Sequence, residues 1–596
     1  MTNRDPRAAR PPACRRSRRA LDHRPALRGR RLPYAAIILL GAAGRFGLAE
    51  AQAQTPAEAP ICEATSPMSP TRLLRRLSID LRGRAPTLAE LEAARDGELH
   101  PGAAIDAWVR SPEFVGVLRA HHERLLWPNL EQIELVPQNH VLFPYPRPSG
   151  HVTYVSPLRS VFVRASGPGY LYEPCLDEPA RFDQDGHLVL EPLVVGSSTV
   201  AWLDGWVEVE PYWAPGTTIK VCALEAIESE RAPVCPDDPE RYPFIEPTCQ
   251  NIDRTARQFD LPFRDSDVDC GGPLAVFAPG CGCGSDLRRC HTQETLARLR
   301  ASFNEQALRI GDRVIEEGRP YHEMLTDRTV EVNGAIAHYL RHQSRLTLDL
   351  FADPDPDAPM ASVPLGWADE AWRSLERTGR HSGVLTTPAY LMRHAAWRQR
   401  AHRFYDAFEC SSFTPSGPLP SPFEPCSQRE DLTERCGCAD CHRTLEPMAA
   451  HWGRFAEFGF MNLDEARFPT RGLQLCRPPF ESLEQLYNCT RLYELQPVGE
   501  EQAYLGYLNA YVFRSPDEQR NIAEGPRKLV GESVASGRFA RCAVERMWTR
   551  FMHRGPTAEE AAQVLPELTR SFVDGGYDLR ALVASITRLP AYGRAP

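Results

Sequence analysis

The chain has 596 residues, of which 42% are hydrophobic and 25% are charged, as in an ordinary soluble globular protein. Its formal net charge of -9 gives no reason to expect nucleic acid or an anionic membrane surface as a partner. The length exceeds what one small core requires, so we expect several domains.

Residues 1–55 are typical of an export signal. An arginine-rich leader precedes a short apolar run from Tyr34 to Gly44, and Ala49, Ala51 and Ala53 then offer a cleavage site. The run is too short to cross a bilayer, and no longer one follows. We therefore expect a signal peptide, export to the periplasm or cell surface, and no transmembrane segment after cleavage.

Residues 56–130 are expected to form an N-terminal helical domain. Thr87 and Glu90 have the spacing of a capping box at the start of one helix. Further helices are expected over 103–109 and 114–127. His121 and His122 are adjacent in the last of these, and we expect them at the surface.

Residues 131–250 lose the helical spacing and are expected to form an inserted β-rich domain. Val207 and Val209 alternate with glutamates, and Ile219 and Val221 also follow a period of two. The intervening Pro215-Gly216 marks a turn, so this stretch predicts a β-hairpin. A Cys-rich connector over 251–291 follows.

The rest of the chain is expected to be mainly helical. We assign a helical domain to 292–410, including one long helix over 389–408, a haem-bearing segment to 411–495 and a C-terminal helical domain to 496–596. The fold class is thus mainly α with an inserted β-rich domain, in a multi-domain, disulfide-containing chain.

One internal similarity joins the two ends. The stretch 82–90 resembles 554–560, since both place Pro-Thr after Arg and Glu three residues after Thr. The similarity indicates either a duplicated helical hairpin or two unrelated capping boxes.

The most specific motif is Cys438-Ala-Asp-Cys441-His442. Two cysteines separated by two residues, with histidine next, are typical of covalent haem c attachment. Cys438 and Cys441 would form thioethers with the haem vinyl groups, and His442 would be the proximal iron ligand.

Other interpretations of the motif are a disulfide, a zinc site or coincidence. Zinc requires four ligands, and no second Cys-x-x-Cys or histidine pair lies nearby in the sequence. Cys436 is a third thiol that could compete with Cys438. The export signal favours haem.

The sixth iron ligand is not determined by the motif. A methionine would suit electron transfer, whereas an open position would suit ligand binding or catalysis. The candidates are Met448, His451, Met461, Met547, Met552 and His553.

A second cysteine cluster comprises Cys281, Cys283, Cys290 and His291. Its spacing favours disulfides over a metal site with Cys270 or a variant haem site.

Three further disulfides are suggested by proximity in the sequence. The expected pairs are Cys222 with Cys235, Cys410 with Cys426 and Cys476 with Cys489.

The chain resembles multi-domain exported proteins of unknown function that carry planctomycete-type cytochrome c domains. The resemblance rests on Cys438-Ala-Asp-Cys441-His442 with Glu446-Pro447 and on helical stretches elsewhere. Ala449 and Gly453 stand where the family usually has glycine and an acidic residue. The similar stretches are 75–87, 332–339, 382–391, 438–459 and 577–592. The resemblance implies export and one haem c, without an established reaction.

The primary hypothesis is an electron-transfer protein with a redox partner protein. One alternative is a haem-dependent redox enzyme that acts on an extracellular substrate, such as a polymer. Another is a disulfide-rich surface protein whose β-rich domain binds its partner. Nucleic acid is not expected as a partner.

Overall fold

The computed structural model of the chain describes residues 67–594, except for some internal segments. The expected signal peptide over 1–55 lies outside the described residues. Within the described residues, no helix is both long and apolar enough to cross a membrane. The omitted internal residues are 157–174, 196–197, 234–266, 276–277, 279, 348, 354–358, 414–419, 430, 478, 481–482 and 498.

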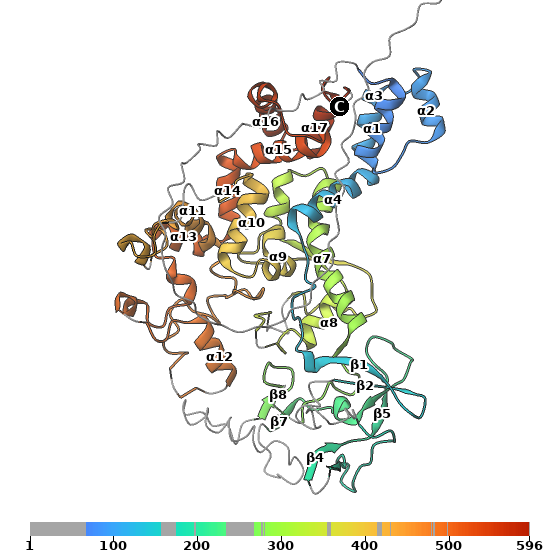
Figure 1. The fold of residues 1–596 in the computed structure, drawn as a ribbon, viewed down its shortest axis with the longest axis vertical. Coiled ribbons are helices and arrows are strands. Elements are labelled where there is room, and N and C mark those ends of the chain that lie inside the picture. Colours follow the sequence, from blue (N-terminus) through green and yellow to red (C-terminus); the bar gives the residue numbers. More distant parts are fainter. Residues whose placement is uncertain are drawn as a thin grey trace, which may run out of the picture. The chain divides into compact units, whose positions relative to one another are not determined.

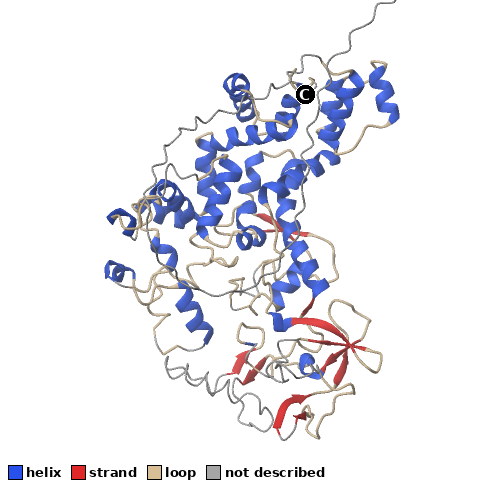
Figure 2. Ribbon diagram, viewed as in Figure 1, coloured by secondary structure: helices blue, strands red, loops and turns tan. Residues whose placement is uncertain are grey.

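The described chain is mainly helical, and most of its strands come between α4 and α7 in sequence order. Figure 2 shows the helices in blue and the strands in red. This arrangement confirms the expected fold class. The helices are α1 (Pro70–Arg82), α2 (Leu88–Arg95), α3 (Pro101–Trp108), α4 (Pro112–Leu126), α7 (Gln293–Glu316), α8 (Gly334–His342), α9 (Pro388–Arg393), α10 (Trp397–Glu409), α11 (Ala439–Ala449), α12 (Leu483–Leu492), α13 (Pro516–Glu524), α14 (Pro526–Ala535), α15 (Arg538–Met552), α16 (Leu565–Asp574) and α17 (Leu579–Arg588).

The longest of these helices, α7, shows how the core forms. Thr292 caps its first turn by accepting a hydrogen bond from the backbone amide of Thr295. Leu296, Leu299 and Phe303 then recur at helical spacing and are all buried. The helix packs this apolar face against α4, α8 and α9 within the main core cluster.

The two ends of the described chain contain similar helix–loop–helix units (Figure 1). The first unit consists of α1 and α2. The second consists of α15 and the helical segment that leads into α16. Each first helix ends at a residue with positive φ, Gly83 at 69° and His553 at 59°. In each unit a Thr–Glu pair makes reciprocal capping bonds. The similarity therefore extends beyond the capping boxes to the turn before each of them.

The first unit also contacts the second unit and the segment that follows α17. The hydroxyl of Tyr592 donates to Asp80 Oδ2 at 2.8 Å, and His553 Nε2 lies 2.9 Å from Asp80 Oδ1. Arg76 stacks over the ring of Tyr592 and donates to its carbonyl oxygen at 2.8 Å.

The β-rich region contains a five-stranded mixed sheet with the order β5-β6-β2-β1-β9. β5 and β6 form the expected antiparallel hairpin, with Val207 opposite Val221 and Val209 opposite Ile219. The edge strand β9 comes directly before α7, so the sheet is joined to the helical core. The strands are β1 (Val141–Pro146), β2 (Val152–Val155), β5 (Trp206–Val209), β6 (Ile219–Cys222) and β9 (His291–Thr292).

Three two-stranded ladders complete the β-structure of the described residues. They pair β3 (Glu191–Val195) with β4 (Ser198–Leu203), β7 (Arg231–Pro233) with β8 (Asp267–Asp269), and β10 (Thr329–Val332) with β11 (Arg373–Glu376).

The described residues contain six disulfides, which fit an exported protein because such bonds persist in oxidising compartments. Of the expected pairs, Cys476 with Cys489 is confirmed, whereas those from Cys222 and Cys410 are wrong. Both actual partners come from distant elements that folding brings together. The six pairs are Cys175–Cys222, Cys270–Cys281, Cys283–Cys290, Cys410–Cys542, Cys426–Cys436 and Cys476–Cys489.

Two local expectations also need correction. The helix expected over 389–408 is divided into α9 and α10, because His394 leaves the helical conformation with φ -109° and ψ 73°. His121 and His122 are buried rather than exposed. The His122 ring packs on Tyr321, and its Nε2 lies 3.1 Å from the Tyr321 hydroxyl, so the site is a tertiary contact.

Candidate functional site

The start of α11 brings together the two cysteines and the histidine of the Cys-x-x-Cys-His motif. Cys438 is the N-cap residue, and the backbone amide of His442 donates to its carbonyl oxygen at 3.0 Å. Residues three and four positions apart share one face of a helix. Both thiols and the imidazole therefore lie on the same face, and all three side chains are partly exposed.

Cys438 and Cys441 differ from the other cysteines of the described residues. They are the two free thiols there, while twelve cysteines form disulfides. Cys436, the third thiol expected to compete for the site, is bonded to Cys426. The motif thus keeps available the two sulfur atoms that thioether attachment of haem requires, which fits the donor set of haem c.

His442 is held by a carboxylate one helical turn further along α11. Its Nδ1 hydrogen-bonds Glu446 Oε1, and Arg398 Nε of α10 donates to the same oxygen at 2.7 Å. Glu446 is only 6% exposed, so these polar partners offset the cost of burying its charge. Sequence reasoning did not assign this contact, although the i, i+4 spacing of histidine and glutamate could have indicated it.

The far end of α11 is fixed by α13, which lies beside it (Figure 1). Pro447 has no backbone amide hydrogen and cannot donate a helical hydrogen bond. Its carbonyl oxygen instead accepts a hydrogen bond from Asn521 Nδ2 at 2.9 Å. α10 and α13 therefore both position the helix that carries the motif.

The sequence-derived candidates for a sixth ligand are not brought together with His442. Met448 lies six residues along the same helix, where its side chain projects from a different face. Met461 belongs to a separate apolar cluster with Cys476 and Phe480. The remaining methionines, Met547 and Met552, are buried on α15.

The two histidine candidates already have other partners. His451 is buried, its Nδ1 lies 2.9 Å from the carbonyl oxygen of Gly525, and burial lowers its pKa to about 4. His553 contacts Asp80. The identity of the sixth ligand stays a prediction.

The second cysteine cluster is structural. Its sulfur atoms are bonded in the Cys270–Cys281 and Cys283–Cys290 disulfides. Both ring nitrogens of His291 have partners, because Nδ1 lies 2.9 Å from Thr295 Oγ1 and Nε2 lies 2.6 Å from Gln343 Oε1. These four residues form no thiolate metal site.

Side-chain geometry in the described residues gives three further groups that could each hold a metal ion. Two of them include both sulfurs of a disulfide, Cys175–Cys222 and Cys426–Cys436. The third is the exposed cluster of Asp183, Asp185 and His187. None of the three contains a residue of the Cys-x-x-Cys-His motif, so the part of the chain that the structure describes gives this motif no further ligands for zinc.

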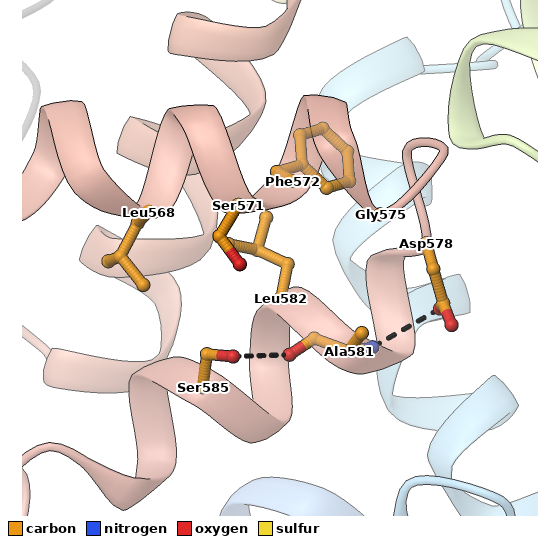
Figure 3. A pocket seen from close by; sticks show the side chains of 8 residues that line it. All are labelled: Leu568, Ser571, Phe572, Gly575, Asp578, Ala581, Leu582 and Ser585. Atoms are coloured by element: carbon orange, nitrogen blue, oxygen red, sulfur yellow. Dashed lines mark hydrogen bonds between the residues drawn. The ribbon is translucent and has the colours of Figure 1, made fainter.

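Three cavities within the described residues are lined by residues outside α11. Figure 3 shows one between α16 and α17, lined by Leu568, Phe572 and Leu582. Its volume of about 20 Å³ is enough for one water molecule. The hydroxyl of Ser585 at its edge donates to the carbonyl oxygen of Ala581.

The chain was compared with protein-family models, curated proteins and solved structures, and none of them matches it. The fold and the site define the class to which the protein belongs: a mainly helical, disulfide-containing protein with a free Cys-x-x-Cys-His motif at the start of a helix.

Proposed function

We propose that the chain is an exported protein that carries one covalently attached haem c and functions in electron transfer with a redox partner protein. The observation that carries the proposal is the state of Cys438 and Cys441. They remain free thiols beside His442, whereas the other cysteines of the described residues are paired. The resemblance to planctomycete-type cytochrome c domains supports the same proposal.

Attachment through this motif needs no external oxidant. The thiols of Cys438 and Cys441 would each add across one vinyl group, forming a carbon–sulfur bond while the thiol proton goes to the neighbouring carbon. His442 would supply Nε2 as the proximal ligand, since Nδ1 is occupied by Glu446. The bound haem supplies one-electron redox chemistry.

The partly exposed position of the motif suits this function. Electron transfer requires only that the redox group approach a partner protein, without a closed substrate pocket. The side chains of Cys438, Cys441 and His442 are all partly exposed to solvent. Covalent attachment lets such an exposed site retain its cofactor.

The test is to express the full chain with an export signal together with haem-attachment machinery. A pyridine haemochrome assay should give one covalent haem per chain, and replacement of Cys438 and Cys441 by Ala should abolish it. The control replaces Cys476 and Cys489, which form a remote disulfide, and should retain haem. A wild-type chain without haem, or haem that persists without Cys438 and Cys441, would overturn the proposal.

A second measurement on the haem-loaded protein distinguishes a function in electron transfer from that of a haem-dependent redox enzyme. A six-coordinate electron-transfer site should leave its absorption spectrum unchanged on addition of cyanide or carbon monoxide. A spectrum that responds to either ligand would indicate an open iron position and favour the enzyme acting on an extracellular substrate.

A further inference from the structure

The environment of Glu446 differs from that of a surface ion pair. Its carboxylate is buried at 6% exposure, and a single oxygen, Oε1, receives both His442 Nδ1 and Arg398 Nε. Arg398 comes from a different helix, α10, and its side chain is 40% exposed. The contact therefore links the motif histidine to a carboxylate and to a cation that reaches solvent.

A hydrogen bond at one ring nitrogen fixes what the other nitrogen can do. When Glu446 accepts a hydrogen bond from the Nδ1–H group, Nε2 keeps its lone pair. The same hydrogen bond restricts rotation of the imidazole ring. A carboxylate acceptor also increases the electron donation of the imidazole more than a neutral acceptor does. A metal bound at Nε2 is thereby stabilised in its more oxidised state.

We propose that Glu446 is a positioning residue that sets the orientation and donor strength of His442 and so holds the reduction potential of the haem site low. This inference rests on the proposed function. Arg398 opposes the effect, because it shares Oε1 with His442 and withdraws part of the carboxylate charge from the imidazole.

The two neighbours of His442 therefore predict potential shifts of opposite sign. Glu446→Gln keeps a neutral acceptor but removes the charge, so the potential should rise. A tenfold change in the ferric–ferrous equilibrium constant toward the ferrous state raises the reduction potential by about 59 mV for one electron. Arg398→Gln leaves the carboxylate charge uncompensated, so the potential should fall.

A matched control separates this effect from general charge removal. Glu434 is an exposed glutamate that pairs with Arg429 in the loop before the motif. This loop lies beside α11, because Arg443 Nε donates to the carbonyl oxygen of Thr433 at 3.1 Å. Glu434→Gln removes the same charge without the His442 contact and should shift the potential much less.

The experiment is a redox titration of the haem-loaded full chain and its three variants, with haem content measured in parallel. The inference is overturned if Glu446→Gln shifts the potential no more than Glu434→Gln, or if Glu446→Gln and Arg398→Gln shift it in the same direction, as general loosening would. Should Glu446→Gln not retain haem, Arg398→Gln decides alone, and an unchanged or higher potential overturns the inference. A wild-type chain without haem would instead contradict the proposed function.

Discussion

Cys436 is bonded to Cys426, and its backbone amide donates to the carbonyl oxygen of Cys426 at 3.2 Å. The disulfide closes the loop directly before the Cys-x-x-Cys-His motif. It leaves one residue, Gly437 in the left-handed conformation with φ 75°, between Cys436 and the free thiol of Cys438. A third sulfur that could compete for haem is therefore held next to the motif in a bonded state.

The first prediction concerns this disulfide. Cys426→Ser frees the Cys436 thiol, which should compete with Cys438 for one vinyl group and produce a mixture of attachment products. After reduction of the disulfide, which leaves thioethers intact, trypsin releases residues 436–443 as one peptide because arginines precede and end it. Fragmentation of that peptide by mass spectrometry should locate the thioethers at Cys438 and Cys441 in the wild type and at mixed positions in the variant.

The double variant Cys426→Ser with Cys436→Ser is the matched control. It lacks the disulfide but also lacks the competing thiol, so uniform attachment should return. Incomplete attachment in the double variant, with only one of the two thioethers formed, would show that the disulfide acts by holding the loop rather than by sequestering Cys436.

The second prediction concerns the support of α11 by α13. Asn521→Ala removes the donor to the carbonyl oxygen of Pro447 and the acceptor for Lys528 Nζ. Losing this partly buried hydrogen bond should lower the free energy of unfolding by about 0.5–1.5 kcal/mol. Urea unfolding should detect that loss. Gln519→Ala replaces a less buried side chain on the same helix, which donates to the carbonyl oxygen of Phe513, and an equal loss there would contradict the specific role of Asn521.

The local parts of the fold were predictable from sequence. A capping box, helical spacing and a Pro-Gly turn indicated α2, α4 and the β5–β6 hairpin, because each depends on residues close together in the chain. The Cys476–Cys489 disulfide, only 13 residues apart, could be inferred in the same way.

Contacts between distant segments were not predictable. The Cys410–Cys542 disulfide joins residues 132 apart and depends on the packing of α10 against α15. Burial of His122 depends in the same way on Tyr321. At the candidate site, the sequence indicated Cys438, Cys441 and His442, but the role of Arg398 required the placement of α10.

The third prediction concerns the contact between the two ends of the described chain. Tyr592→Phe removes the hydroxyl that donates to the buried carboxylate of Asp80. In the variant the Asp80 carboxylate loses this hydrogen bond but keeps its contact with His553. We therefore expect the free energy of unfolding to fall by about 1–3 kcal/mol. Tyr405→Phe, at a half-buried tyrosine that stacks on Phe413, is the control. A Tyr592→Phe protein as stable as this control would contradict a stabilising role for the bond.

The fourth prediction is a pH dependence of stability that arises from buried neutral histidines. His291 is fully buried, and desolvation lowers its pKa to about 4 from the ordinary value of 6.5. The unfolded chain therefore binds a proton between pH 6.5 and about 4 that the folded chain does not bind. The free energy of unfolding should consequently fall as the pH falls through this window.

One such group contributes up to about 1.4 kcal/mol per pH unit within the window. His291→Gln keeps a polar side chain beside Gln343 but cannot titrate, so the variant should lose less stability than the wild type between pH 6.5 and 4.5. Urea unfolding at both pH values measures the difference. His100→Gln, which replaces an exposed histidine, should keep the wild-type slope. Equal slopes for the wild type and His291→Gln would contradict the assignment of this proton to His291.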